Sequence, residues 1–404
     1  MAQKKIFKKI AEKSIEKLFT VSGAVTSIAI LFITLFMFSE GAALFKSPEL
    51  EQGYGVYVHT KNPVSYLSPN DLKKIFDKES DNWKDFNGEE ARIKVFRMDD
   101  IFNYYPEKEM GKNYELLPQK WAEYIQKEPN SIVFLPKKFA PKSNEIKEIS
   151  TQNIQYKDFF LGKEWLPTAT PAPLFGVLPL VLGTLLVSIV ALIIALPFGL
   201  GVAIYLSELA GEKQKKIMKP IIELLAGIPS VVYGFFGLVV LAPLMQKSFN
   251  LPVGETALTG SIILAIMALP TIISVAEDAM SNTPRAMREA SLALGATQWQ
   301  TIYRVVIPYA KSGISTAVVL GIGRAIGETM AVLMVTGNAA LMPQSLLDST
   351  RTITATIAAE LGEAPSGGAH YQALFLLGCI LFVFTMIISI VAEIISKKKT
   401  NPTH

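Results

Sequence analysis

The chain has 404 residues, of which 50% are hydrophobic and only 18% are charged, and its mean hydropathy is +0.33. A soluble globular domain usually carries about a quarter charged residues, so the composition excludes an ordinary soluble enzyme and predicts an integral membrane protein. The formal net charge of +4 says little about partners until it is placed along the chain. The one cysteine, Cys379, can form no intramolecular disulfide, and the three histidines are too widely spread to predict a metal site.

Long apolar runs predict six membrane-spanning helices. A helix needs roughly 20 apolar residues to cross the hydrocarbon core. Five runs carry no charged residue: Leu18–Phe38, the part of Trp165–Ser207 that begins near Leu174, Leu224–Gln246, Thr256–Ala276 and Tyr371–Ala392. A sixth run, Tyr309–Thr336, is apolar but contains three charged residues. The predicted fold is therefore an all-α polytopic membrane protein.

The distribution of lysines predicts that both termini are cytoplasmic. The first 17 residues contain six lysines, the segment Glu208–Lys219 contains four, and the tail includes Lys397–Lys399. Six alternating spans put these segments on one side, and the positive-inside rule makes that side cytoplasmic. A cleaved signal peptide is the alternative for the N-terminus. The apolar stretch of 21 residues in Leu18–Phe38 exceeds the ~7–15 of a signal peptide, so we expect a retained first helix.

Between the first and second spans, residues 46–172 are rich in charge and predict a small α/β insert on the extracytoplasmic side. The runs Gly55–His59 and Ile93–Phe96 are typical of short strands. Ser68 followed by Pro69 predicts the start of a helix that continues through Asp71–Phe76.

The segment Thr283–Ala310, between the fourth and fifth spans, predicts a short helix on the cytoplasmic side. Thr283 can cap this helix, Pro284 fits its first turn and Gly295 stops it. About a dozen residues are too few to span a membrane. Small residues would let the helix approach the groove of a partner closely; they are Ala286, Ala290 and Ala293. The alternative is an amphipathic helix lying on the membrane surface.

This loop carries a specific resemblance. Glu289-Ala290-Ser291, then Gly295, then Ile307-Pro308 resemble the "EAA" loop of ABC-importer permeases. In that family the loop is the coupling helix that receives force from the ATPase subunit. The resemblance implies that the coupling residues here are Arg288, Glu289, Ala290, Gly295 and Ala296.

Three further blocks resemble the phosphate permeases of the PstC type: Leu225–Gly234, Gly323–Ala331 and Gly368–Phe375. The first block, in the third span, contributes the motif residues Gly227, Pro229, Ser230, Tyr233 and Gly234. The resemblance covers about residues 172–396. It implies a permease core over 173–396 with a coupling loop over 281–308, preceded by the first helix in residues 1–45 and followed by a cytoplasmic tail, 397–404.

The same resemblance implies the biological setting. It implies import of inorganic phosphate through the cytoplasmic (inner) membrane of a bacterium. The implied partners are a second permease subunit forming a heterodimer, two ATP-binding cassette subunits and an extracytoplasmic phosphate-binding protein. Membrane lipid surrounds the chain, and no nucleic acid partner is implied.

Nucleotide chemistry is expected to belong to another chain. Gly111-Lys112 and Gly162-Lys163 lack the upstream glycine and the following Ser or Thr of a P-loop. We therefore expect no enzyme activity and no cofactor in this chain, with ATP and Mg used by the partner ATPase. Three alternatives stay open. They are a permease for another small oxyanion, a membrane-anchored sensor, which should carry a cytoplasmic output domain, and an ion-driven secondary transporter.

Two charged residues inside the fifth span, Arg324 and Glu328, are candidates for the translocation path. They are four residues apart, so on a continuous helix they share one face. A charge at membrane depth costs at least ~2.5 kcal/mol, and such residues usually face a bundle interior or a water-filled path. We expect Arg324 to contact the anion transiently and Glu328 to restrain it. The alternative is a purely structural ion pair. At the end of the fourth span, we expect Glu277 to be solvated or to serve a partner at the helix end.

The insert has a resemblance of its own. Lys61–Ser68, Asn82–Lys84 and Ile93–Arg97 resemble one lobe of the periplasmic phosphate-binding protein. That family continues from the arginine into a Ser-Gly-Thr phosphate loop, whereas Arg97 is followed here by Met98–Ile101, which contains two carboxylates. Because carboxylates repel an anion, we expect the insert to be a non-binding relic or a docking element.

Overall fold

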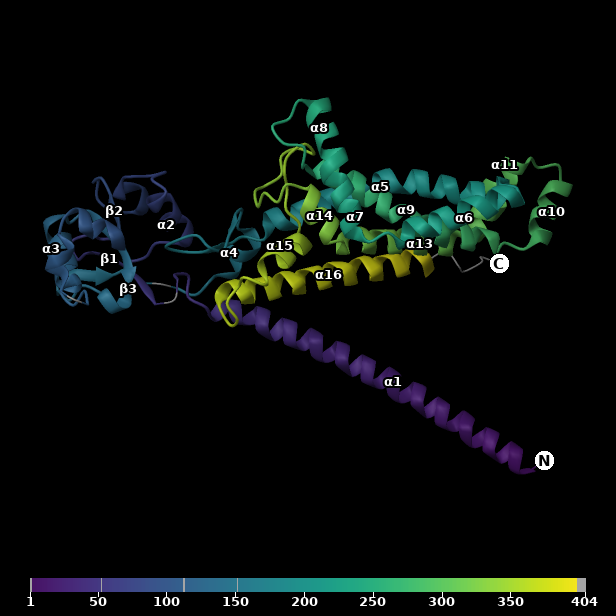
Figure 1. Ribbon diagram of the computed structural model, residues 1–404, viewed down its shortest axis with the longest axis horizontal. Helices are drawn as coiled ribbons and strands as arrows, with labels where there is room; N and C mark the ends of the chain where they lie inside the picture. Colours follow the sequence, from purple (N-terminus) through teal and green to yellow (C-terminus); the bar gives the residue numbers. More distant parts are fainter. Residues whose placement is uncertain (1, 52, 112, 151, 398–404) are drawn as a thin grey trace.

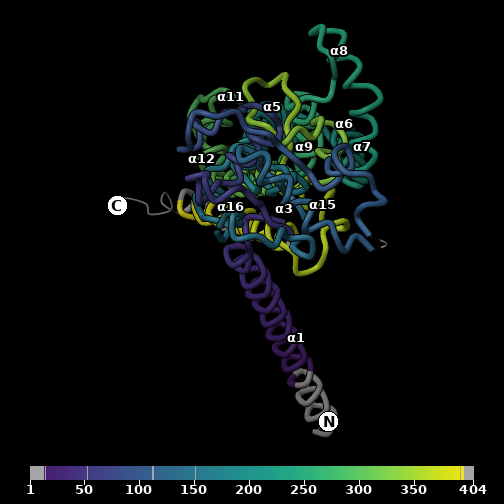
Figure 2. The backbone as a smooth tube through the Cα atoms, turned by 90° about the vertical axis from the view of Figure 1, so that its left-hand side faces the viewer, coloured from purple at the N-terminus to yellow at the C-terminus, as the bar shows by residue number. Residues whose placement is uncertain are grey.

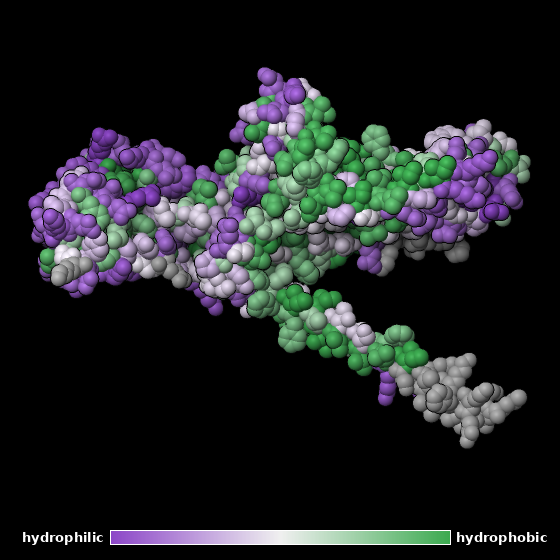
Figure 3. All heavy atoms as spheres, viewed as in Figure 1, coloured by the Kyte–Doolittle hydropathy of each residue, from purple (hydrophilic) through white to green (hydrophobic). Residues whose placement is uncertain are grey.

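The computed structural model describes residues 2–51, 53–111, 113–150 and 152–397; most of the predicted tail lies outside them. The molecule is elongated, with an α/β insert at one end, a helical bundle in the middle and the loop of α10 (Arg285–Ala293) and α11 (Gln298–Thr301) at the other end (Figure 1). The first helix, α1 (Ala2–Ala43), diverges from the bundle, as the perpendicular view also makes plain (Figure 2). Hydrophobic surface covers the middle of the molecule, and hydrophilic surface covers the insert (Figure 3).

Five described helical segments are long and apolar enough to cross a membrane: Ile15–Lys46, Leu178–Leu209, Ser230–Phe249, Ala257–Ser281 and Ala369–Val391. A bent pair, Gln298–Tyr309 and Lys311–Gly327, meets at 72° and supplies a sixth span if counted as one. The prediction of a polytopic six-span architecture is confirmed, with the fifth span broken rather than straight.

Three helices form the centre of the bundle: α5 (Leu178–Ile204), α9 (Ala257–Ser281) and α13 (Lys311–Gly327). Ile272 of α9 is fully buried between a glycine of α5 and a glycine of α13. A Cβ atom at either Gly199 or Gly321 would lie 2.8 Å from the Ile272 side chain. Lipid is as apolar as leucine, so close packing, rather than exclusion of water, holds such helices together. The two glycines are what allow both helices to approach α9.

The third span is not one continuous helix. α6 (Glu212–Gly227) ends before Ile228, which is extended, and α7 (Ser230–Phe236) starts after Pro229. A residue before proline is disfavoured in the helical conformation, which explains the break. The Tyr233 hydroxyl in α7 donates to the carbonyl oxygen of Leu225 in α6 at 2.9 Å, and this hydrogen bond bridges the break between the two helices. The predicted third span, Leu224–Gln246, therefore starts later than expected, because the long apolar helical segment here is Ser230–Phe249.

The rest of the bundle is assembled from shorter elements. After α7 come a π-helical turn, η7 (Gly237–Leu241), and α8 (Ala242–Phe249). The bent span comprises α11 (Gln298–Thr301), η8 (Ile302–Val306) and α12 (Ile307–Tyr309) before α13. The chain then forms α14 (Met330–Val335), α15 (Ile353–Glu360) and α16 (Ala369–Lys397). The N-terminal part of α1 and the C-terminal part of α16 both extend toward the end of the molecule that carries α10 (Figure 1).

The insert is built on a four-stranded sheet of order β2-β3-β1-β4. The strands are β1 (Tyr54–His59), β2 (Lys94–Arg97), β3 (Ser131–Pro136) and β4 (Ile146–Glu148). β3 pairs parallel with β2 and antiparallel with β1. Alternate residues of β3 face opposite ways, so Ile132 packs toward α2 (Pro69–Phe76) and Val133 toward α3 (Leu117–Lys127).

The predicted helix start at Ser68 is confirmed in detail. The Ser68 hydroxyl accepts from the backbone N–H of Asp71, and the Asp71 carboxylate accepts from the N–H of Ser68. This capping box satisfies two backbone donors that would otherwise lack partners. Between the insert and the bundle lie η1 (Leu44–Lys46), α4 (Tyr156–Leu161) and a two-stranded ribbon, β5 (Trp165–Leu166) with β6 (Leu174–Phe175).

Candidate functional site

The loop between α9 and α11 contains the predicted short helix, α10 (Arg285–Ala293), which has nine residues. Gly295 has a φ of +84°, a left-handed conformation that favours glycine, so the predicted stop is confirmed. The predicted start is wrong in one respect. Pro284 is the N-cap residue, and the buried Thr283 hydroxyl has no hydrogen-bond partner among the described residues.

The described residues leave one side of this loop uncovered. Glu289, Ala290 and the other two predicted alanines are exposed. Leu294, which comes just before Gly295, is 89% exposed. A short helix that leaves an apolar side chain and small residues uncovered is suited to docking against another protein.

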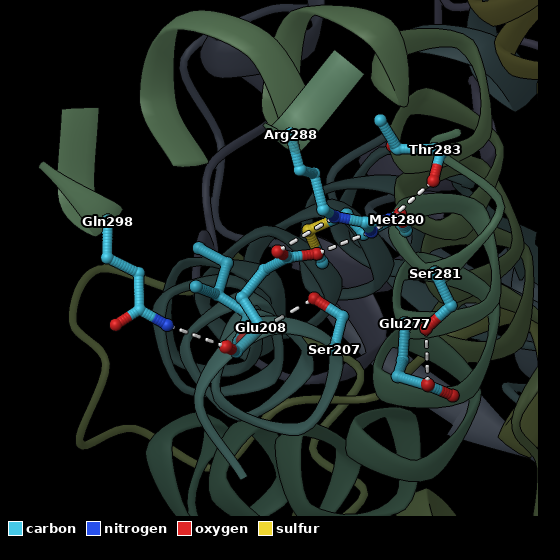
Figure 4. A network of polar contacts seen from close by, with 9 residues as sticks. Ser207, Glu208, Glu277, Met280, Ser281, Thr283, Arg288 and Gln298 are labelled. Carbon is cyan, nitrogen blue, oxygen red and sulfur yellow. Dashed lines mark hydrogen bonds and ion pairs between the residues drawn. The ribbon is translucent and has the colours of Figure 1, made fainter. Parts of the chain in front are cut away.

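The opposite side of α10 is fixed to the bundle by Arg288 (Figure 4). Its Nη2 and Nε donate to the two carboxylate oxygens of Glu208 at 2.8 and 3.1 Å. Its remaining donors reach the carbonyl oxygens of Met280, at 2.9 Å, and Thr283. A bidentate arginine–carboxylate pair has both strength and a fixed geometry. Arg288 thus joins α10 to the end of the second span and to the end of α9 at once.

Glu208 makes a second contact with the loop through its backbone. The side-chain amide of Gln298, at the start of α11, donates to the Glu208 carbonyl oxygen at 3.0 Å (Figure 4). Glu208 lies on a π-helical turn, η6 (Tyr205–Leu209), that extends α5. Such turns are rare and are frequent at functional sites. Neither Glu208 nor Gln298 was singled out in the sequence, because their partners lie 80 and 90 residues away in the chain.

A second ion pair lies nearby and joins α6 to α9. The Lys219 ammonium is 2.9 Å from the Glu277 carboxylate, which also accepts from the Ser281 hydroxyl at 2.7 Å. Glu277 is buried, so the expectation that it is solvated was wrong. The hydrogen bond with Glu277 raises the pKa of Lys219, which keeps its ammonium group charged at neutral pH.

Arg324 lies near the end of α13 and faces α9. Its Nη1 is 3.4 Å from the Thr271 hydroxyl oxygen, and its buried Nε has no hydrogen-bond partner in the described part of the chain. The Nε donor is therefore not matched by any protein group that the structure describes. A guanidinium in this state can still donate to an anion.

Glu328 does not share a helical face with Arg324, so that prediction was wrong. α13 ends at Gly327, and Glu328 is extended, with φ −70° and ψ 134°. Its carboxylate accepts from the N–H of Ala331 at 3.4 Å, at the start of α14, and its backbone carbonyl accepts from the Thr354 hydroxyl at 2.7 Å. Among the described residues no ion pair joins Arg324 to Glu328. The carboxylate instead sits at a helix N-terminus, where a negative charge is stabilised.

The motif of the third span is placed around the break in that span. Pro229 is the N-cap of α7 and Ser230 its first residue. Gly234 approaches α14 closely, since a Cβ there would lie 3.0 Å from the Cα of Ala331. Gly227 meets nothing within 4 Å. The motif therefore fixes a bend and one helix contact.

A partly buried polar cluster at the opposite end of the bundle was also missed by sequence reasoning. Glu360 accepts from the indole of Trp165 at 2.9 Å and from Arg351 at 2.6 Å, and it lies 2.9 Å from Nε2 of His370. Burial favours a raised pKa, but the hydrogen bonds from His370 and Trp165 and the charge of Arg351 outweigh it, so the pKa of Glu360 is lowered. Its four members come from four separate segments, which no local pattern connects.

Comparisons with known proteins cover both the loop of α10 and the segment that contains Glu360. Residues 195–401 match the family model described as "Binding-protein-dependent transport system inner membrane component". A probable ABC transporter permease protein of Bacillus subtilis (strain 168), YqgH, is 41% identical over 242 residues, covering 60% of this chain and 78% of that protein.

Two further relatives are named phosphate transport system permease protein PstC. The one from Mesorhizobium japonicum is 40% identical over 254 residues, covering 58% of this chain and 76% of its own. The one from Pasteurella multocida is 37% identical over 256 residues, covering 59% and 78%. The residues that the family model matches include the loop of α10 and Arg324. Together with the six-span architecture, these matches show that the chain belongs to the binding-protein-dependent transport system inner membrane components.

Proposed function

We propose that this chain is a permease subunit of an ATP-driven importer and that its solute is inorganic phosphate. The observation that carries the proposal is the loop of α10, exposed on one side and fixed by Arg288 to two spans on the other. Phosphate as the solute is supported by the PstC relatives, of whose length the match covers about three quarters.

In this mechanism the exposed side of α10 docks on the ATPase. Glu289, Ala290, Gly295 and Ala296 form or shape that side. When the ATPase moves α10, Arg288 carries the displacement to Glu208 and to the last carbonyls of α9. Because α9 packs between α5 and α13 at Ile272, these three helices receive the movement together. A two-oxygen ion pair transmits such a displacement better than a single contact, since it also resists rotation.

The proposed path for the anion runs beside Arg324. Its guanidinium has a buried donor, Nε, from which no described protein group accepts, and its hydrogen bond to the Thr271 hydroxyl is long at 3.4 Å. A weakly held arginine can bind an oxyanion and release it again. Glu328 contributes differently from our first expectation: it stabilises the start of α14 beside the break in the fifth span.

The proposed assembly contains a second permease subunit, two ATP-binding cassette subunits and an extracytoplasmic phosphate-binding protein. ATP and Mg are bound and used by the ATPase subunits. The beginning of α1, the end of α16 and α10 share one end of the molecule, so we place both termini on the cytoplasmic side with the ATPases. The insert, at the opposite end, then faces the binding protein.

We propose that the insert docks a partner and does not itself bind phosphate. The backbone N–H of Arg97 donates to the Asp100 carboxylate at 2.7 Å, so a protein carboxylate already occupies the donor that an anion would use. The Arg97 guanidinium lies over the Phe76 ring, 5.6 Å from its centroid, and donates to the Thr170 hydroxyl. Its groups are thus engaged in holding the insert together.

Reconstitution of the complex tests the proposal. The chain, its partner permease, the ATPase and the binding protein in proteoliposomes should take up radiolabelled phosphate only with ATP inside. Glu289→Lys should abolish this uptake while leaving membrane insertion intact, because Glu289 is exposed and outside the spans. Glu212→Lys, at an exposed acid near the start of α6, is the matched control and should transport normally.

A second candidate function is import of another small oxyanion, because Arg324, with its unused hydrogen-bond donor, could bind other oxyanions as well. The same proteoliposomes decide between the two. Sulfate or molybdate that is taken up while phosphate is not would identify the other solute. Normal uptake by Glu289→Lys in an intact complex would contradict the coupling role itself.

A further inference from the structure

The exposed surface of the short helix α4 is more apolar than is usual for a helix in water. Tyr156, Phe160 and Leu161 are 65%, 43% and 60% exposed. At 100° per residue these three and Lys157 fall on one arc of the helix, which is the exposed one. The exposed arc of a helix in water is normally polar. Here it is mainly aromatic and aliphatic.

The position of α4 explains such a surface. Phe159, on the other side of the helix, is fully buried in the same core as Leu44, at the end of the first span, and Val177, just before α5. The Tyr156 ring lies 3.9 Å from the Phe45 ring, centroid to centroid. The N–H of Val177 donates to the carbonyl of Phe159 at 2.9 Å. α4 is thus fixed at the level where the apolar spans end, which is where aromatic side chains concentrate in membrane proteins.

An apolar crevice begins directly at this helix. It encloses about 470 Å³ and is walled by Phe38 of α1, Phe160 of α4, Val181 of α5 and Leu376, Ile380 and Phe384 of α16. Apart from the thiol of Cys379, every side chain that lines it is apolar. It lies where α1 diverges from α16 (Figure 1), and the surfaces of α1 and the bundle on either side of that divergence are hydrophobic (Figure 3).

The size and place of the crevice restrict what fills it. Three of its walls belong to membrane spans, so it opens into hydrocarbon and not into water. One turn of an α-helix, at least about 10 Å wide and 5.4 Å long, occupies roughly 420 Å³, so the crevice has room for about one turn and not for a helix long enough to span the membrane. A flexible hydrocarbon chain fits both its volume and its lining.

We propose that α4 rests in the headgroup layer of the leaflet nearest the insert, and that the crevice below Phe160 binds one acyl chain of a phospholipid. Tyr156 then lies at the interface, and Lys157 extends to the lipid phosphates, as lysines beside apolar surface do. This anchor holds the insert at a fixed height above the membrane. It does not depend on which solute the complex carries.

The depth of α4 can be measured on the assembled complex in phospholipid nanodiscs. Cys379 is the only cysteine, so Cys379→Ser gives a background for single spin labels at Leu161→Cys, Tyr104→Cys and Ile387→Cys. Tyr104 is exposed on the insert, and Ile387 is exposed on α16. The label at position 161 should prefer oxygen over a water-soluble nickel chelate more than the label at 104 and less than the label at 387. Accessibility equal to that at 104, or shielding from both reagents, overturns the interfacial position.

The acyl-chain site has a separate readout. Doxyl-labelled phosphatidylcholine should show a motionally restricted component in wild-type complex that Ile380→Trp removes by filling the crevice. Ile387→Trp, on the exposed side of the same helix, should keep it. Val383→Phe is a milder replacement at the same wall if the tryptophan variant does not assemble. A restricted component that survives both crevice variants, or one that is missing in the wild type because another subunit covers the crevice, overturns the proposal.

Discussion

Arg288 of α10 donates to both carboxylate oxygens of Glu208, a residue 80 positions earlier at the end of the second span. The Glu208 side chain is 8% exposed and that of Arg288 is 20% exposed, so water screens the pair little. The same guanidinium also donates to the carbonyl oxygens of Met280, near the end of α9, and of Thr283, just after it. The Arg288 side chain therefore links the loop of α10 to two membrane spans.

The first prediction follows from this pair. Glu208→Gln leaves a neutral acceptor opposite a mostly buried guanidinium, and breaking a buried pair by removing one charge costs about 3 kcal/mol. We expect the complex to assemble but to transport much less phosphate for each ATP hydrolysed. Uptake and ATP hydrolysis measured together in proteoliposomes give this ratio.

The control for this experiment is Glu212→Gln, which removes an exposed acid four residues further along. Arg288→Lys is the complementary variant, because a lysine keeps the charge but cannot donate to both oxygens. An unchanged ratio of phosphate to ATP in both Glu208→Gln and Arg288→Lys would show that the pair does not transmit force.

The second prediction concerns Gly295. An L-residue in its left-handed conformation costs roughly 1–2 kcal/mol, and no neighbour lies within 4 Å of a Cβ there, so backbone strain is the whole effect. Gly295→Ala should weaken binding of the ATPase subunit in a pull-down of the complex. Gly295→Asn should bind more normally, because asparagine tolerates this conformation. Equal binding by all three proteins would exclude a role for the helix stop.

The third prediction separates Arg324 from Glu328. Arg324→Gln should stop uptake while assembly and basal ATP hydrolysis persist, since a neutral amide cannot replace the charge that meets the anion. Glu328→Gln should retain most uptake, because an amide oxygen can still accept from Ala331 at the start of α14. If both variants fail equally, or if Arg324→Gln prevents assembly, the role of Arg324 is structural.

The fourth prediction concerns the insert. A separately produced fragment of residues 46–172 should bind no phosphate in a calorimetric titration, because the Asp100 carboxylate already accepts from the Arg97 N–H. Asp100→Asn removes that charge and serves as the comparison. Circular dichroism establishes that each fragment is folded. Micromolar binding by the folded wild-type fragment would assign the insert a direct role in capture.

The fifth prediction is a pH dependence at Glu360. Its pKa is lowered from the ordinary 4.5, so its ion pairs stabilise the fold fully above that value and are lost as the pH falls through the lowered pKa. The stability difference between wild type and Glu360→Gln should therefore be steady down to about pH 5 and shrink below it. Thermal unfolding in detergent across this range measures the difference. A difference that grows on acidification would contradict the assigned direction.

Local sequence predicted the elements whose signals lie within a few residues. The uncharged runs predicted the spans, because a membrane accepts only segments that satisfy their own backbone hydrogen bonds. The Ser68–Asp71 capping box and the stop at Gly295 were likewise readable, since each depends on neighbours in the chain. The short helix α10 could also be predicted from its flanking signals and its length, whereas its docking role stays a prediction.

The sequence by itself thus determined that the chain crosses the membrane several times and where its α/β insert lies. The tertiary structure alone decided what the charged residues do. Spacing of four residues suggested that Arg324 and Glu328 share a face, but the helix ends between them because Glu328 is extended and held by Thr354 and Ala331. Glu208 had no local signal at all. Its function depends on Arg288, and only folding brings two groups so distant in the chain within hydrogen-bonding range.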